Sequence, residues 1–206
     1  VVGTTITIDP PLMFVAAGAS TAVREVTFQS ALAGIENLKL QGNFSTSIVR
    51  LIRFMHTRNS WAKGIESYGL GDTGGSGNSN HIQTNDAYGV EIRDNYFHGH
   101  NSTNAGGMNY SVSIINWNSH HKVENNVGQF GRHAWIISGG AGGSAILYNY
   151  SRDYFEQGSA HLSVDCSVNH GATTFMVLWE GNDCQQMMGD YTHGSGAYNT
   201  LFRNYA

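Results

Sequence analysis

The sequence predicts an all-β fold, and both its composition and its internal organisation lead to this expectation. Charged residues make up only 13% of the 206 residues while hydrophobic residues make up 40%, a balance that favours a folded core over a disordered chain. The chain contains 26 glycines and is also rich in asparagine, so turns should be frequent and long helices rare. Short apolar stretches recur between these turn residues, as expected of strands.

A short phrase, in which an apolar residue is followed by an asparagine, recurs along the chain. VEIRDNYFHGH (90–100), KVENNVGQ (122–129) and SAILYNYSRD (144–153) share this shape. The aligned markers are Asn37, Ser67 in place of an asparagine, Asn95, Asn126, Asn149, Asn182 and Asn204. Their steps of 22 to 33 residues are typical of stacked repeats. One strand phrase per repeat, paired with the same phrase in the next, predicts a parallel β-solenoid that rises about 4.8 Å per coil.

The expected elements follow one another in a regular order. In residues 1–33, the stretches VVGTTITID and REVTF are predicted to be N-terminal strands that cap the solenoid, and residues 34–206 form its coils within one domain. The later strand phrases are AKGIES (62–67), YGVEIR (88–93), KVEN (122–125), SAILYN (144–149) and HLSVDCSVNH (161–170). The marker asparagine is predicted at a coil corner, because asparagine tolerates left-handed backbone angles and because stacked amides can hydrogen-bond along a column.

These phrases resemble a known family. The pattern V-x-I-x-D-N-x-F of residues 90–97, repeated at similar intervals, is similar to the right-handed parallel β-helix of the pectate-lyase-like superfamily. The resemblance implies a single-stranded right-handed parallel β-helix of about seven coils. Because TLFRNYA (200–206) stops within one of the phrases, we expect the solenoid to be truncated at its C-terminus. The superfamily includes lyases, hydrolases, phage tailspikes and adhesins, so the fold alone does not define an activity.

Residues at equal offset from the marker are expected to form vertical columns. Three residues past the marker the column contains Leu70, His98, Gln129, Arg152 and Gln185, and His100, Asp153 and Asp183 lie beside it. Long insertions at 99–110, 153–172 and 185–198 would wall a groove that suits a linear polymer. The alternative interpretation is an ordinary solvated face.

Two chemistries fit such a groove. Elimination from a uronate requires a base, for which Arg152 or His98 is the candidate, and a cation near the carboxylate, supplied by Arg93 or calcium. Hydrolysis of a neutral glycan requires two carboxylates, for which the candidates are Asp153 with Asp183 or Asp190. The expected substrate-binding residues are Gln129, Gln185, His100, Arg93 and Trp117, the last as a flat platform for a sugar ring.

An acidic column is the candidate metal site. Glu36, Glu66 and Asp94 each precede the aligned marker by one residue and should therefore stack. Lyases of the superfamily use calcium to bind a uronate carboxylate, so the resemblance implies that these three acids hold Ca²⁺. The alternative is a solvated acidic edge and no cofactor.

The glycine-rich stretch MMGDYTHGSGAYN (187–199) places Asp190 three residues before His193. These residues are candidates for a catalytic acid/base pair. The spacing equally fits a turn in which Asp190 caps backbone amides, and the turn is the favoured interpretation.

The two cysteines, Cys166 and Cys184, also leave two interpretations open. Cys166 alternates with apolar residues at strand period in HLSVDCSVNH, which favours a small buried side chain. A disulfide with Cys184 is the alternative, and it would fit an extracellular location.

Together these features predict a secreted polysaccharide-active protein, extracellular or at the cell surface, that acts as a polysaccharide lyase or glycoside hydrolase. The alternative is a non-catalytic glycan-binding, adhesive or fibre-forming solenoid. The formal net charge of −4 gives no general attraction to nucleic acid, and no apolar stretch reaches the roughly 18 residues of a membrane span. Polysaccharide is therefore the expected partner. Open ends would also allow a homo-oligomer or end-to-end stacking.

Overall fold

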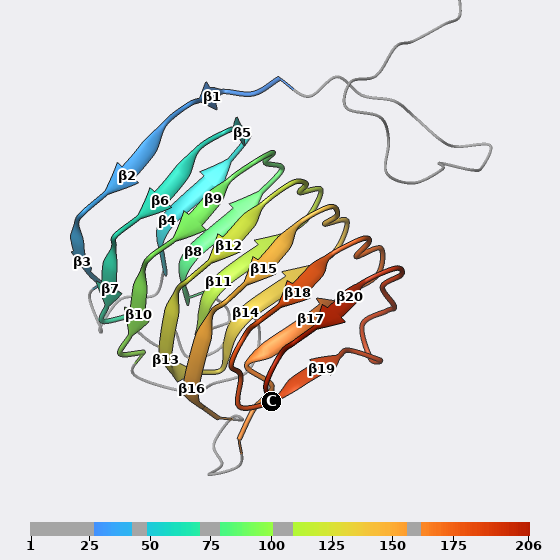
Figure 1. Ribbon diagram of the computed structural model, residues 1–206. Coiled ribbons are helices and arrows are strands. Elements are labelled where there is room, and N and C mark those ends of the chain that lie inside the picture. The colour runs from blue at the N-terminus through green and yellow to red at the C-terminus, as the bar shows by residue number, and fades with distance from the viewer. Residues whose placement is uncertain (1–26, 43–48, 71–78, 101–108, 156–161) are drawn as a thin grey trace, which may run out of the picture.

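The chain is all-β. The computed structural model describes residues 27–42, 49–70, 79–100, 109–155 and 162–206, which form twenty short strands (Figure 1). These residues contain no helix, and hence none long and apolar enough to cross a membrane. Every pairing between the named strands is parallel. The arrangement is compatible with the predicted parallel β-solenoid.

Three main sheets take their strands from successive parts of the chain. The seven-stranded sheet contains β2 (Gly34–Glu36), β6 (Trp61–Lys63), β9 (Glu91–Arg93), β12 (Lys122–Glu124), β15 (Ala145–Leu147), β18 (Leu178–Glu180) and β20 (Thr200–Phe202). The five-stranded sheet contains β3 (Lys39–Gln41), β7 (Glu66–Tyr68), β10 (Tyr96–His98), β13 (Val127–Gly131) and β16 (Tyr150–Tyr154). The six-stranded sheet contains β4 (Val49–Met55), β8 (Ser79–Asn85), β11 (Tyr110–Ile115), β14 (His133–Ser138), β17 (Cys166–His170) and β19 (Met187–Gly189).

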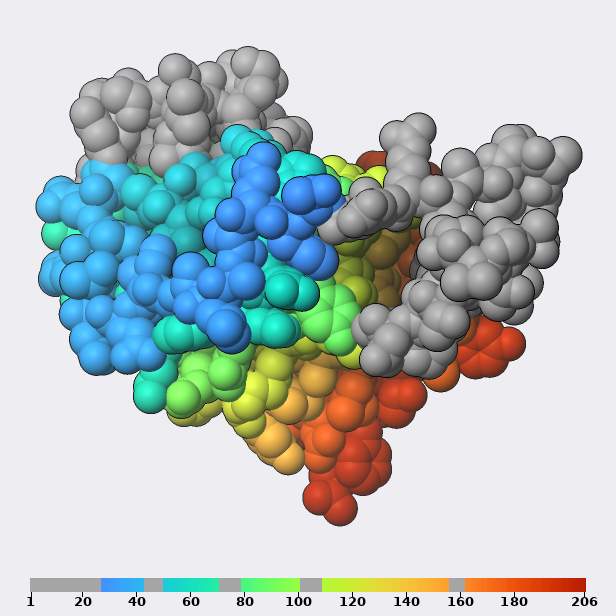
Figure 2. All heavy atoms as spheres, turned by 90° about the horizontal axis from the view of Figure 1, so that it is seen from above, coloured from blue at the N-terminus to red at the C-terminus, as the bar shows by residue number. Residues whose placement is uncertain are grey.

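The chain advances in rungs, and most of the described rungs contribute one strand to each sheet in turn. β8, β9 and β10 form one rung, which is followed by β11–β13 and then by β14–β16. Figure 2 shows the rungs following one another in chain order, from the blue end to the red end. A shorter ladder, in which β1 (Ser30–Ala31) pairs with β5 (Thr57–Arg58), continues as single bridges between later rungs. Residues of similar position in the repeat are therefore brought together.

A left-handed residue makes the turn between the seven-stranded and five-stranded sheets in every rung. The backbone φ of this residue lies between 50° and 65° throughout. The column consists of Asn37, Gly64, Asp94, Asn125, Tyr148, Gly181 and Arg203. Glycine, asparagine and aspartate suit this conformation, and they supply most of the column. The left-handed corner was predicted, but it falls one residue before the marker asparagine.

The marker asparagines form a hydrogen-bonded ladder that runs through the stack. From Asn95 through Asn126, Asn149 and Asn182 to Asn204, each Nδ2 donates to the Oδ1 of the next asparagine at 2.9 Å. The same Nδ2 also donates to a backbone carbonyl of the preceding rung. The predicted stacking of these five residues is therefore confirmed.

The first two predicted markers are wrong. Asn37 belongs to the left-handed column, and Ser67 pairs with Phe97, two residues beyond the ladder position. Ile65 occupies the ladder position instead, and its backbone N–H donates to Asn95 Oδ1 at 2.9 Å. The error arises because an alignment on side-chain identity shifts where a rung has no asparagine at the ladder position.

Apolar side chains fill the space between the sheets. Ala62, Ile92, Val123, Ile146 and Trp179 are the central residues of consecutive strands in the seven-stranded sheet, and all are buried. A disulfide joins Cys166 in β17 to Cys184 after β18, with a Cα–Cα distance of 6.1 Å. The disulfide alternative is thus the one found, and both cysteines are also buried.

Candidate functional site

The outer surface of the five-stranded sheet carries several predicted site residues. In β10, Tyr96 and His98 point outward while Phe97 between them is fully buried. In β16, Tyr150 and Arg152 flank the buried Ser151 in the same way. Because alternate residues of a strand face opposite sides of a sheet, the parallel register stacks the outward side chains into columns.

We call these outward residues the sheet face. Its first column contains Lys39, Glu66, Tyr96, Val127, Tyr150 and Asp183, and its second contains Gln41, Tyr68, His98, Gln129 and Arg152. The prediction that His98, Gln129 and Arg152 share one column is confirmed. Leu70 is not part of it, because Leu70 is fully buried and Tyr68 takes that position.

Three aromatic rings stack at the N-terminal part of the sheet face. The His98 ring lies 4.3 Å from the ring of Tyr96 and 5.4 Å from that of Tyr68, and is close to parallel with both. His98 Nε2 is 3.2 Å from Glu66 Oε1, and Lys39 Nζ is 2.9 Å from the same oxygen. The hydrogen bonds from Lys39 and His98 lower the pKa of Glu66 and keep it ionised. His98 is thus held by its neighbours on several sides.

Gln129 connects the aromatic rings to the acidic end of the sheet face. Tyr96 donates its hydroxyl proton to Gln129 Oε1 at 2.9 Å, and Gln129 Nε2 donates to Asp153 Oδ2 at 3.1 Å. Asp153 itself has a left-handed backbone, as Gly69, Gly99 and Phe130 have at the same corner of earlier rungs. Its unusual backbone is therefore a feature of the turn and no sign of a strained catalytic residue.

Arg152 is held at the C-terminal end of the sheet face, next to Asp153. Its guanidinium donates to Asp183 Oδ1 and lies 4.8 Å from the centre of the Tyr150 ring. The hydrogen bond from Arg152 to Asp183 raises the pKa of Arg152. This shift is opposite to the lowered pKa that the predicted role of Arg152 as a base required.

The other predicted substrate-binding residues lie elsewhere or are already engaged. Gln185 uses its side-chain amide on the backbone of Tyr154 and on Ser163 O. His100 is buried against the ring of His81, and burial lowers its pKa to about 3. His100 is therefore not exposed for binding, contrary to the prediction.

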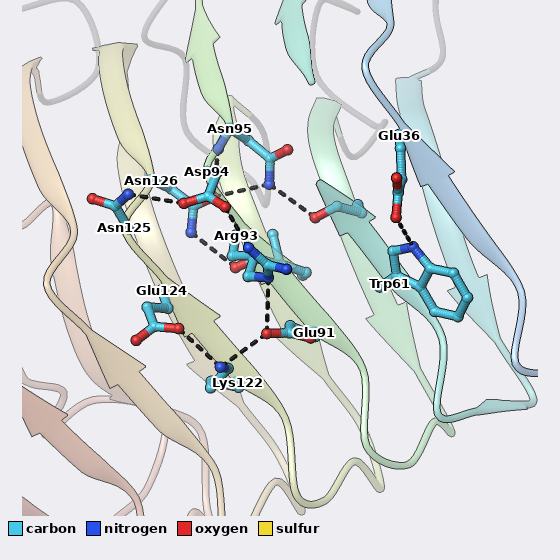
Figure 3. A network of polar contacts seen from close by, with 12 residues as sticks. Glu36, Trp61, Glu91, Arg93, Asp94, Asn95, Lys122, Glu124, Asn125 and Asn126 are labelled. Carbon is cyan, nitrogen blue, oxygen red and sulfur yellow. Dashed lines mark hydrogen bonds and ion pairs between the residues drawn. The ribbon is translucent and has the colours of Figure 1, made fainter. Parts of the chain in front are cut away.

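Arg93 and Trp117 lie outside the sheet face. Arg93 is on the outside of the seven-stranded sheet, where it pairs with Glu91 at 3.0 Å and Asp94 at 2.6 Å (Figure 3). Trp117 is 72% exposed, as a sugar platform requires, but it follows β11 of the six-stranded sheet. Neither is positioned to act with His98 or Arg152.

The three acids predicted to hold calcium do not stack. Glu36 pairs in register with Lys63, Glu66 pairs with Tyr96, and Asp94 belongs to the left-handed column, so they occupy three separate columns. Each acid has its own partner: Trp61 Nε1 donates to Glu36 at 2.7 Å, and Asn125 Nδ2 donates to Asp94 at 2.8 Å (Figure 3). The expected calcium column is therefore wrong, for the same reason as the first two markers.

A second group of side chains assembles around Asp190. Asp190 Oδ2 lies 2.6 Å from His193 Nδ1 and 2.7 Å from His170 Nδ1, and the two histidine rings are 4.3 Å apart. We call these three residues the histidine–aspartate cluster. Burial opposes ionisation of Asp190, but hydrogen bonds from the His193 ring and from backbone amides outweigh it and lower its pKa to about 2. The favoured turn interpretation is found, since Asp190 Oδ1 accepts the backbone N–H groups of Thr192 and His193, while the acid/base role of Asp190 and His193 stays a prediction.

Several residues of these two groups escaped the sequence analysis. Three of them are tyrosines of the sheet face, Tyr68, Tyr96 and Tyr150. Each lies two residues from an outward-facing neighbour in its strand or pairs with one in the next strand, so they can be found from the sequence only when the strand register is known. His170 joins the cluster from a different strand, twenty residues before Asp190 in the chain, and no local spacing indicates that contact.

Three comparisons, with protein-family models, with curated proteins and with solved structures, find no match for this chain.

Proposed function

We propose that this chain is a secreted polysaccharide-binding protein and that a linear glycan lies along the sheet face. The observation that carries the proposal is the continuity of exposed tyrosines and hydrogen-bonding side chains across successive rungs. Tyrosine rings offer flat apolar surfaces to the C–H faces of sugars, and nearby amide and carboxylate groups bond hydroxyls. Successive rungs lie about 4.8 Å apart, so the outward side chains follow one another along the stack, which suits an extended polymer.

The charges on the sheet face favour a neutral glycan over a polyuronate. Lys39 is paired with Glu66 and Arg152 with Asp183. Asp153 adds a further carboxylate beside Gln129. Among the described residues of this face, both strong cations are therefore already paired, and Asp153 beside the face makes the local balance acidic, which disfavours a polyanion.

Binding is favoured over catalysis because the candidate catalytic groups are engaged. The raised pKa of Arg152 opposes a role as a base. The ring of His98 is held between Tyr68 and Tyr96, and its Nε2 is already engaged by Glu66 at 3.2 Å. Hydrolysis by Asp153 and Asp183 remains an outcome that the experiment below would detect.

The finer features of the fold and location also belong to this proposal. We propose that the rungs form one single-stranded right-handed parallel β-helix of about seven coils, of the pectate-lyase-like type. The regular alternation of rungs among three parallel sheets supports it. The disulfide between Cys166 and Cys184 supports secretion, because such bonds persist mainly in oxidising compartments.

Affinity measurements with a panel of neutral glycans, pectins and alginates test the proposed binding. Tyr96→Ala and Tyr150→Ala should each weaken binding of a neutral glycan by about tenfold, because each removes a stacking surface. Tyr191→Ala is the matched control, since Tyr191 is an exposed tyrosine outside the sheet face. Reducing ends and unsaturated uronates are measured in the same samples.

Two results would overturn the proposal. Equal affinity of the two sheet-face variants and the parent would remove the face from the binding site. Release of reducing ends or unsaturated uronates by the parent would instead make the protein an enzyme.

A further inference from the structure

We propose that the histidine–aspartate cluster, formed by His170, Asp190 and His193, binds one divalent transition-metal ion of the zinc class. The cluster belongs to the end of β17 and to the turn after β19, both on the six-stranded sheet, and is separate from the sheet face. The proposal therefore stands independently of glycan binding. It rests on three properties of the cluster: the donor atoms converge, the carboxylate is oriented, and a coordination position is left open.

Three donor atoms of the right kinds converge. The Nδ1 atoms of His170 and His193 approach Asp190 Oδ2 at 2.7 and 2.6 Å, and one donor atom of each residue lies within 4.8 Å of the other two. Imidazole nitrogen and carboxylate oxygen are the ligands of catalytic and other three-ligand zinc sites. A ligand set of two nitrogens and one oxygen disfavours calcium and magnesium, because both ions prefer oxygen ligands.

The carboxylate of Asp190 is oriented by bonds that leave Oδ2 directed at the rings. Its other oxygen, Oδ1, accepts the backbone N–H groups of Thr192 at 2.6 Å and His193 at 3.1 Å. The backbone of Asp190 is also fixed, since its N–H donates to Asn169 O at 3.2 Å and Asn169 Nδ2 donates back to Asp190 O at 3.1 Å. Such supporting bonds are typical of residues that ligate metals.

A metal ion would require only a small movement. Zinc–ligand distances near 2.1 Å in a tetrahedron place the ligands about 3.4 Å apart, so each histidine would move less than about 1 Å from Asp190 Oδ2. His193 can make this movement because its side chain is 55% exposed. That exposure also leaves a fourth position open to water or to another ligand, as in three-ligand zinc sites.

A further buried nitrogen lies beside the cluster. The His133 ring is 6.2 Å from the His170 ring. His133 Nδ1 contacts Val164 O, whereas its Nε2 is buried and has no hydrogen-bond partner within the part of the chain that the structure describes. The environment of the cluster therefore contains a polar atom that its own packing does not satisfy.

Metal titration of the whole chain tests the proposal. Zn²⁺ binding is measured by calorimetry on chelator-treated protein, and Co²⁺ binding by its visible absorption, which reports coordination by the protein. We expect one ion per chain, and at least tenfold weaker binding in His193→Ala, His170→Ala and Asp190→Asn. His98→Ala is the matched control, because His98 is another part-exposed histidine that contacts a carboxylate, Glu66, and it should bind Zn²⁺ like the parent.

His193→Ala is the variant expected to keep its fold, because this exposed side chain is not part of the core. Circular dichroism verifies the fold of each variant. Absence of saturable binding would overturn the proposal and leave a cluster held by hydrogen bonds alone. Unchanged binding in His193→Ala, or an equal loss in His98→Ala, would also overturn it. None of these results depends on whether glycan binds, since the sheet face retains all its side chains in the three cluster variants.

Discussion

The side chain of Asn126 joins three rungs. Its Oδ1 accepts the backbone N–H of Asn95 at 3.1 Å and Asn95 Nδ2 at 2.9 Å. Its Nδ2 donates to Ile92 O at 3.0 Å and to Asn149 Oδ1 at 2.9 Å. Because the side chain is buried, each of these partners would lose its bond without gaining water if the amide were removed.

We therefore expect Asn126→Leu to lower the free energy of unfolding by about 1–3 kcal/mol, through the orphaned polar groups on both neighbouring rungs. Urea denaturation of the variant and the parent measures this difference. A variant as stable as the parent would show that the ladder contributes nothing to stability.

Asn125 provides the control for this substitution. It is exposed, and its φ of 53° belongs to the left-handed column that Gly64 and Gly181 also occupy. Asn125→Gly should therefore change the stability by no more than about 0.5 kcal/mol, because glycine suits this conformation. Comparing the stability changes of Asn126→Leu and Asn125→Gly separates the contribution of the asparagine ladder from that of the left-handed corner.

The roles of single residues were predictable where the chemistry is local to the repeat. An amide column was expected from the recurring asparagine, and Asn95, Asn126 and Asn149 form it. The pKa of Arg152 was predicted in the wrong direction because its partner, Asp183, comes from the next rung, 31 residues away. A charge supplied by another rung changes the pKa and cannot be inferred from the local sequence.

Whole strands likewise were predicted correctly in some columns and incorrectly in others. The columns of His98, Gln129 and Arg152 were correct, because these residues keep the same offset from a true ladder asparagine. The column of Glu36 and Glu66 was incorrect, because their rungs have no such asparagine and the alignment slipped. A shift of one residue in a strand exchanges its outward and inward faces, so a small alignment error removes a whole candidate site.

The disulfide links β17 to the segment after β18 across the core. Cys166 and Cys184 are separated by 18 residues in the chain. Replacing both by Ala should lower the free energy of unfolding by about 3 kcal/mol, because the open loop is less restricted in the unfolded chain. Urea denaturation with and without reductant measures this effect. If reductant leaves the parent as stable as before, the disulfide is not a stabilising element.

The molecule as a whole contains several buried histidines that should make its stability depend on pH. Burial lowers the pKa values of His100, His121 and His133 to about 3, and that of His81 well below its usual value. In the unfolded chain these groups titrate near pH 6.5. Below that pH the unfolded state binds protons that the folded state does not, so stability is lost as the pH falls.

We expect each of these histidines to remove about 1.4 kcal/mol of stability per pH unit as the pH falls from about 6 towards 4. Urea denaturation at a series of pH values measures the slope. In His121→Asn the slope of stability against pH should decrease by the contribution of one titrating group. Asparagine is chosen because its side-chain oxygen can accept the Val90 N–H, which now donates to His121 Nδ1 at 2.9 Å. A slope unchanged by this substitution, or a parent whose stability is constant over the range, would contradict the expectation.

The stacking of the rungs, on which both proposed sites depend, is most directly tested by nuclear Overhauser effects among the ladder asparagines. In ¹⁵N-edited spectra, side-chain amide protons of Asn95 should show contacts to those of Asn126, and the series should continue through Asn149 and Asn182 to Asn204. Contacts from Asn95 to Asn126 but not onward, or amide protons that exchange with water as fast as those of an unfolded chain, would contradict a continuous stack.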